Sequence, residues 1–140
     1  MVASRSSDNP GSVARLSTST RMQNYHQLDV WQRAMTYAAD LYRFSAQLPD
    51  SERYNLTAQL RKAATSVPLN IAEGAGCKTN GEFARFLGYA YRSLKQVITC
   101  LELCELLYPA LSGQSLDVLI DEGNGQDIKG EAIGWLGVID

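Results

Sequence analysis

The stretch from Gln59 to Gly76, QLRKAATSVPLNIAEGAG, decides the fold of this chain. Its apolar residues keep helical spacing although a proline, Pro68, stands in the middle. A helical proline cannot donate to the carbonyl four residues back, and its ring presses on that carbonyl, at a cost of about 3 kcal/mol. We therefore expect a helix kinked at Pro68, with Ser66 and Asn70 satisfying freed backbone groups. The Gly74-Ala75-Gly76 run predicts its end.

The segment before this helix predicts a first helix from Asp29 to Leu48. Asp29 and Gln32 have the spacing of a capping box at its start. Leu48 is followed by Pro49 and Asp50, which predict its end. Its apolar stripe comprises Trp31, Ala34, Met35, Ala38, Leu41, Tyr42, Ser45 and Leu48.

The segment after the proline-containing helix predicts the longest helix, up to Tyr108. Thr79 and Glu82 form a second capping box. An unbroken heptad seam predicts lengthwise helix packing at about +20°, and three long helices with short connections favour antiparallel neighbours. The sequence thus predicts an all-α, antiparallel up-and-down four-helix bundle. The seam comprises Phe83, Leu87, Ala90, Leu94, Val97, Leu101, Cys104 and Tyr108.

The fourth element begins as a helix over residues 115–120, with Ser112 or Ser115 as its cap, and then becomes rich in glycine. Each glycine inside a helix costs about 1 kcal/mol relative to alanine. We expect a short or broken fourth helix, with a second apolar piece over residues 131–138, although a divergent or frame-shifted end fits equally well.

The chain divides into three parts by composition. Residues 1–22 are rich in Ser, Thr, Gly and Arg without apolar periodicity, which predicts a disordered arm. Residues 23–120 form the predicted bundle domain, and residues 121–140 an acidic, glycine-rich segment.

Composition narrows the class of protein. The chain has 140 residues, 45% hydrophobic and 20% charged, which suits one globular domain without a membrane-spanning segment. Its three cysteines form no disulfide framework, which favours a reducing cytoplasm. The net charge is −2. Residues 21–110 carry ten Lys or Arg against eight Asp or Glu, whereas residues 111–140 carry six acidic residues and one lysine.

Three segments resemble a small bacterial family of four-helix bundle proteins: residues 59–76, LDVWQRAM (28–35) and GEFARFLGYAYRSLKQ (81–96). The founding members of this family are encoded by intervening sequences within 23S ribosomal RNA genes. A relative is the accessory protein of the reverse transcriptase of diversity-generating retroelements. The resemblance extends from Tyr25 to Tyr108 and implies a helical bundle, a cyclic homopentamer and, as in that relative, a basic surface that binds nucleic acid. Family members usually begin near the position of Met22, so an upstream start-codon assignment is one explanation of the arm.

The most repeated pattern of the family carries over to individual residues of this chain. Two positions that are usually glutamate in the family are Gln96 and Ile98 here, which puts any role of those acids in doubt. The matching positions are Gln59, Arg61, Ser66, Pro68, Asn70, Ile71, Ala72, Glu73 and Gly74, then Phe83, Arg85, Phe86, Leu87 and Ser93.

Catalytic, cofactor and metal sites find little support in the sequence. The run Gly74–Thr79 imitates a phosphate-binding loop, but it follows a helix and lacks the required glycines. Cys100 and Cys104 are one helical turn apart, and we interpret them as core or boundary residues rather than metal ligands. His26 has no oriented partner, and no base is spaced to activate Ser66. We therefore expect no enzyme activity, no cofactor and no metal.

Basic residues of the second and third helices give the main functional signal. They recur on the side of the third helix away from its seam, where Tyr89 and Tyr91 could stack on bases. The ordinary alternative is a solvated face paired with Glu73, Glu82 and Glu102, which the residues alone favour; the resemblance raises the binding interpretation. The candidate nucleic-acid-binding residues are Arg61, Lys62, Lys78, Arg85, Tyr89, Arg92 and Lys95.

Aromatic residues outside the predicted stripes suggest self-association. Tyr37 and Phe44 lie off the first stripe, and Phe86 and Tyr91 lie off the seam, so we expect subunit contacts there. The expected protein is a non-enzymatic homo-oligomer, a pentamer by the resemblance. It would bind structured RNA or DNA, or a nucleic-acid-handling protein, in the cytoplasm. The alternative is an interaction scaffold without nucleic-acid contact.

Replacing Pro68 by alanine tests the predicted kink. Pro68→Ala should change assembly more than helix content, because a straightened helix aims its second half differently. Light scattering measures the assembly and circular dichroism the helix content. An unchanged oligomer mass would contradict the prediction.

Overall fold

The computed structural model describes residues 25–128 and 130, and this part of the chain holds four α-helices and no strand. The predicted all-α class is therefore confirmed for the described residues. The predicted arm over residues 1–22 and the predicted second C-terminal piece over residues 131–138 lie outside them. The α-helices are α4 (Asp29–Ser45), α5 (Leu56–Ala75), α6 (Asn80–Leu107) and α7 (Gln114–Gly125), and the 3₁₀ helices are η1 (Tyr25–Gln27), η2 (Asp50–Glu52) and η3 (Pro109–Leu111).

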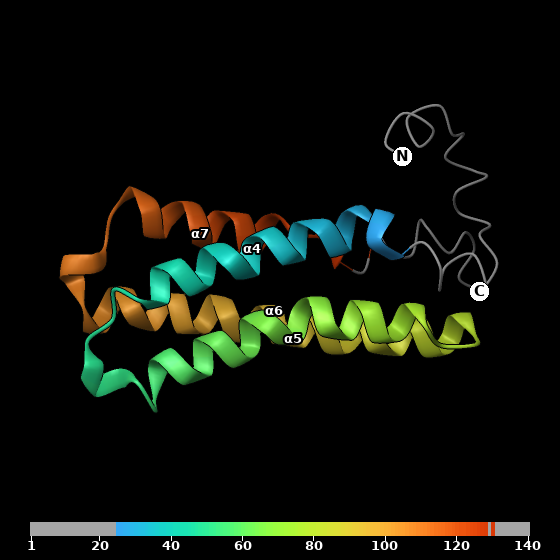
Figure 1. Ribbon diagram of the computed structural model, residues 1–140. Coiled ribbons are helices and arrows are strands. Elements are labelled where there is room, and N and C mark those ends of the chain that lie inside the picture. The colour runs from blue at the N-terminus through green and yellow to red at the C-terminus, as the bar shows by residue number, and fades with distance from the viewer. Residues whose placement is uncertain (1–24, 129, 131–140) are drawn as a thin grey trace.

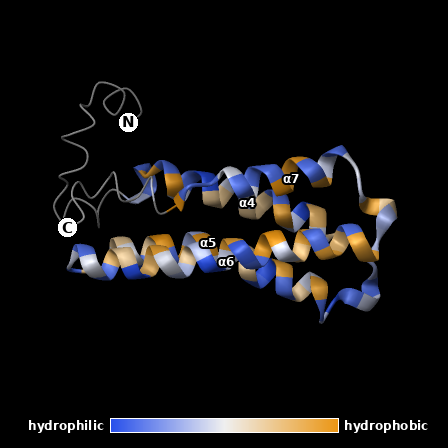
Figure 2. Cartoon of the chain, turned by 180° about the vertical axis from the view of Figure 1, so that it is seen from behind, coloured by the Kyte–Doolittle hydropathy of each residue, from blue (hydrophilic) through white to orange (hydrophobic). Residues whose placement is uncertain are grey.

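The four α-helices lie side by side with their long axes along roughly one direction (Figure 1). The α4–α5 and α6–α7 connections are at one end of the molecule, and the α5–α6 connection is at the other. Contacts between α5 and α6 are the most extensive, followed by those between α4 and α5. Helix α7 packs on both α6 and α4. Each helix mixes hydrophilic and hydrophobic residues along its length (Figure 2).

The predicted seam of α6 forms the centre of the core. Its members from Phe83 to Cys104 are all buried, and Tyr108 at the C-terminal end is half-buried. Thr79 caps the helix by accepting a hydrogen bond from the Glu82 amide at 3.1 Å, as the capping box predicts. The seam and the start of α6 are thus confirmed.

Helix α4 starts at Asp29, as predicted, but its cap differs from the prediction. Leu28 occupies the N-cap position without a side-chain cap, and Asp29 is the first helical residue, so the Asp29–Gln32 capping box is wrong. The Gln32 amide instead donates to the carbonyl of His26 at 2.8 Å. A side-chain hydrogen bond to η1 therefore holds the entry to the helix.

The buried side of α4 is rotated relative to the predicted stripe. Met35 and Tyr42 are 46% and 41% exposed, whereas Tyr37 and Phe44 are 1% and 4% exposed. The reason is that α4 packs against both α5 and α7, so its buried arc turns towards a second neighbour. The inference that Tyr37 and Phe44 make subunit contacts is wrong, because the chain's own core covers both rings.

Pro68 lies inside α5, which continues through it from Leu56 to Ala75. The Asn70 amide donates to the carbonyl and the hydroxyl of Ser66, at 2.8 and 2.9 Å. The Ser93 hydroxyl of α6 donates to the same Ser66 hydroxyl at 2.8 Å. The sequence predicts that Ser66 and Asn70 serve the backbone of α5; their hydrogen bonds also connect that helix to α6.

Gly74 has a packing role that the sequence does not reveal. It is a buried residue within α5, and the helix ends one residue later, with Gly76 as the C-cap. A Cβ atom at Gly74 would lie 2.8 Å from Phe83 Cδ1 and 2.8 Å from Phe86 Cβ. Real Cβ atoms do not approach so closely, so the absence of a side chain allows α5 and α6 to meet here.

Helix α7 begins after Gly113, whose φ of 156° suits glycine, so neither Ser112 nor Ser115 is its cap. The helix includes Gly123, where a Cβ atom would collide with the Tyr37 hydroxyl. That hydroxyl donates to the carbonyl of Leu119 at 2.7 Å. Gly123 therefore lets the helix dock on Tyr37.

Alanine substitutions at two glycines should have opposite effects on stability. Gly74→Ala should lower the free energy of unfolding by about 1–3 kcal/mol, because the added methyl group forces α5 away from Phe83 and Phe86. Gly88→Ala in α6 is the matched control, since nothing lies within 4 Å of its Cβ position; it should raise stability by about 0.5–1 kcal/mol. Urea unfolding midpoints measure both, and equal shifts would contradict the close-approach role of Gly74.

Alkaline pH should weaken the docking of α7. Burial, reinforced by Glu122, raises the pKa of Tyr37 above its ordinary value. The unfolded chain ionises this phenol near pH 10, so the stability that it contributes is present below that pH and is lost as the pH rises further. Unfolding titrations between pH 8 and pH 11 should show a smaller loss for Tyr37→Phe than for the unaltered protein. Tyr54→Phe, at a ring that is 83% exposed, should behave as the unaltered protein does.

Candidate nucleic-acid interface

The outer side of α6 carries four of the predicted site residues. Arg85, Tyr89, Arg92 and Lys95 all lie exposed on the side opposite the buried seam. We call these four residues the basic face. Their spacing of three and four residues places them in one row along the helix. The burial of the seam therefore dictates the exposure of the row.

The cations of the basic face have no carboxylate partner in the described part of the chain. An ion pair within the described residues joins Arg43 and Asp40 at 2.8 Å, and it lies on α4. The alternative in which Glu73, Glu82 and Glu102 neutralise the row has no ion pair among the described residues to support it. The positive charge of the row is thus available to an anionic ligand.

Aromatic rings accompany each of these cations. The Arg92 guanidinium lies 5.7 Å from the Tyr89 ring centroid, and Lys95 Nζ lies 5.1 Å from that of Tyr91. Arg85 lies 5.9 Å from the ring of Phe86. Exposed aromatic rings beside cations can stack on bases while the cations contact phosphates.

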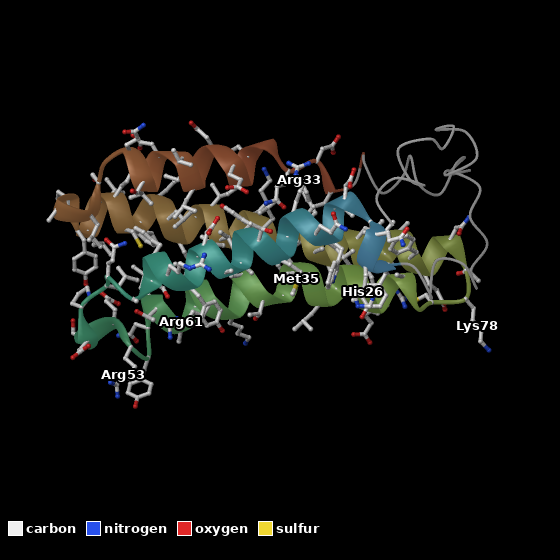
Figure 3. All side chains as sticks on the ribbon, turned by 45° about the horizontal axis from the view of Figure 1, so that its top comes forward. His26, Arg33, Met35, Arg53, Arg61 and Lys78 are labelled. Atoms are coloured by element: carbon white, nitrogen blue, oxygen red, sulfur yellow. The ribbon has the colours of Figure 1, made fainter. Side chains whose placement is uncertain are left out.

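Lys62 is a further predicted site residue, on α5. It is exposed and stands four residues before Ser66, on the same side of its helix. Because Ser66 contacts Ser93 of α6, Lys62 lies on the side of α5 nearest α6. Lys78 lies exposed in the α5–α6 connection, beyond the Arg85 end of the row, and Figure 3 places it at that end of the molecule.

Arg61 is separated from these residues. Its Nε donates to the Ser45 hydroxyl at 2.7 Å, and its guanidinium lies 4.9 Å from the Tyr42 ring centroid. Both contacts are with α4, so the side chain faces away from α6. Lys62 and Lys78 are thus exposed on α5 and in the α5–α6 connection, while the Arg61 side chain lies between α4 and α5.

The residues of the predicted structural motif of α5 differ in how far they are buried. Pro68 and Gly74 are buried, Asn70 is half-buried beside Ser66, and Glu73 is exposed. Pro68 also borders an apolar groove between α4 and α5. These residues shape the helix pair that carries the interface rather than the interface itself.

The described residues form neither a metal-binding cluster nor an activated thiol at Cys104. No group of three or more His, Cys, Asp or Glu in this part of the chain could hold a metal ion. Burial, with smaller effects of Cys100 and Glu52, raises the pKa of Cys104 to about 11. A thiol in this state is mostly protonated at neutral pH and is a poor nucleophile.

Three leucines extend the exposed side of α6 beyond the basic face. Leu103, Leu106 and Leu107 are 41%, 78% and 56% exposed. They are not among the predicted site residues, although the heptad register already places these positions away from the seam. The outer side of α6 therefore carries cations from Arg85 to Lys95 and exposed leucines from Leu103 to Leu107.

None of the helices in the described ranges is long and apolar enough to cross a membrane. The model of a family described as 23S rRNA-intervening sequence protein matches residues 26–122, which is more than half of the chain. No curated protein matches this chain.

Proposed function

The chain belongs to the family of 23S rRNA-intervening sequence proteins, and we propose that it binds structured RNA or DNA through the basic face of α6, without enzyme activity. The observation that carries the proposal is a row of three exposed cations without ion pairs in the described part of the chain. Each of them lies beside an aromatic ring.

The chemistry of this face suits a nucleic-acid backbone. Cations that neutralise phosphates release condensed counterions, which favours binding at low salt. Tyr89 and Tyr91 offer surfaces on which unpaired bases can stack, independently of sequence. Lys62 and Lys78 would add contacts at the edge and the end of the row. A resemblance to the reverse-transcriptase accessory protein supports the same ligand class, or a partner that handles nucleic acid.

We further propose that the protein is an antiparallel up-and-down bundle, kinked at Pro68, that assembles into a homopentamer in the cytoplasm. The placement of the connections in Figure 1 supports the bundle topology. An apolar groove of about 510 Å³ between α4 and α5 supports self-association, since it exposes Met35, Tyr42 and Leu69. These side chains replace Tyr37 and Phe44 as candidate contacts.

The second candidate is a protein-interaction scaffold without nucleic-acid contact. The exposed leucines at the end of α6 favour it, because contiguous apolar side chains on a surface commonly mark protein contacts. The two functions differ in what the basic face does, so charge reversal there separates them.

Reversing two charges of the basic face tests the proposed function. Arg85→Glu with Arg92→Glu should abolish retention on ribosomal RNA and on duplex DNA, because repulsion replaces two phosphate contacts. For the unaltered protein, the logarithm of the binding constant should fall linearly with the logarithm of the salt concentration. Titrations at several salt concentrations measure both effects.

A matched control separates the effect of where a charge is reversed from the effect of the change in net charge. Arg92→Glu and Arg43→Glu change the net charge equally, but Arg43 lies on α4 in an exposed pair with Asp40. Arg43→Glu should bind nearly as the unaltered protein does. If the two single variants bind alike, or if the unaltered protein binds neither nucleic acid at low salt, the scaffold function takes the place of the proposed one.

A further inference from the structure

A small polar pocket lies where the end of α4, η2 and the start of α5 meet. Its volume is about 190 Å³, and its polar lining comprises Ser45, Asp50, Arg53, Thr57 and Arg61. Figure 3 shows Arg53 and Arg61 towards the same end of the molecule, opposite Lys78. We propose that this pocket binds a phosphate group, as a site separate from the basic face of α6.

Arg61 is held ready for such a ligand. Ser45 is 1% exposed; its hydroxyl accepts from Arg61 Nε at 2.7 Å and donates to the Tyr42 carbonyl at 2.8 Å. The Tyr42 ring lies against the guanidinium. These contacts occupy one nitrogen and one face, and the two terminal nitrogens make no hydrogen bond within the described residues. An oriented guanidinium whose two terminal NH₂ groups are free is suited to bidentate binding of an oxyanion.

The segment that carries Arg53 is fixed as well. The Glu52 carboxylate accepts from the Leu56 amide at 3.2 Å and from the Tyr108 hydroxyl at the end of α6. This anchors η2 between α5 and α6. Arg53 follows directly and forms no ion pair within the described residues. The pocket therefore has two cations on anchored backbone.

Charge and size define the ligand class. The two guanidinium groups outnumber the single carboxylate, Asp50, and the Thr57 hydroxyl adds a neutral donor. The pocket is smaller than the roughly 300–1,000 Å³ of sites for whole small molecules, so it suits a phosphate group rather than a nucleotide. Asp50 can accept a hydrogen bond from a protonated phosphate oxygen or from a hydroxyl beside it. Inorganic phosphate and a terminal phosphate monoester both meet these conditions.

Titration of the full-length, ¹⁵N-labelled protein with inorganic phosphate at constant ionic strength tests the site. Saturable shifts of the amide signals of Ser45, Arg53, Thr57 and Arg61 are expected, with the signals of the basic face unmoved. Trinucleotides with a 5′-phosphate or a 5′-hydroxyl identify the source of the group. Shifts at the pocket with the phosphorylated form alone would indicate a nucleic-acid end, whereas shifts with inorganic phosphate alone would indicate a free anion.

Variants add a second readout. Arg61→Lys keeps the charge but loses the fork, and it should weaken phosphate binding about tenfold, as should Arg53→Ala. Thr57→Val removes one hydrogen-bond donor from the pocket and leaves the Arg61–Ser45 contact between α5 and α4 in place. It therefore still tests the site if Arg61→Lys disturbs the fold. Arg43→Ala is the control on α4 and should bind normally.

Two outcomes would overturn the site: shifts that rise linearly without saturation, or unchanged binding in all three pocket variants. The charge-reversed variant of Arg85 and Arg92 should still bind phosphate in this pocket. Failure of the proposed function and failure of this inference are therefore distinguishable.

Discussion

The close contact between α5 and α6 is the constraint on which the rest of the structure depends. It requires a residue without a side chain at position 74, because Phe83 and Phe86 occupy the space that a Cβ atom would need. A hydrogen bond from the Ser93 hydroxyl to the Ser66 hydroxyl, near the middle of both helices, fixes the register of the same pair. The two helices share the largest contact in the described chain, and α4 and α7 pack onto this pair. A substitution that separates α5 from α6 would therefore displace the helices packed on them.

This contact also places the candidate site. Because the α6 seam is buried against its neighbours, the opposite side of the helix must face solvent, and the basic face lies there. On α5, Lys62 is exposed to solvent as well. Arg61, the preceding residue in the chain, points to α4 instead, since neighbouring helical positions are about 100° apart. One residue of difference thus assigns two adjacent cations to two separate surfaces.

Most of the α6 features could be predicted from the sequence, and most of the α4 features could not. A heptad repeat and a capping threonine are local signals, and both are confirmed in α6. Helix α4 has two packing partners, so its buried arc depends on where α7 docks, which no periodicity encodes. The same holds for Gly74 and Gly123, whose value lies in atoms of another helix. The Arg61–Ser45 contact joins residues 16 apart and leaves no sequence motif.

The change of character along the outer side of α6 gives this surface a direction. An elongated partner would meet cations and aromatic rings first and leucines afterwards, so its two possible orientations are chemically unequal. In any closed cyclic assembly, rotation preserves the sense of every helix relative to the axis. Wherever α6 runs along that axis, such a ring would have one basic rim and one apolar rim, and two such rings could stack through like rims or unlike ones.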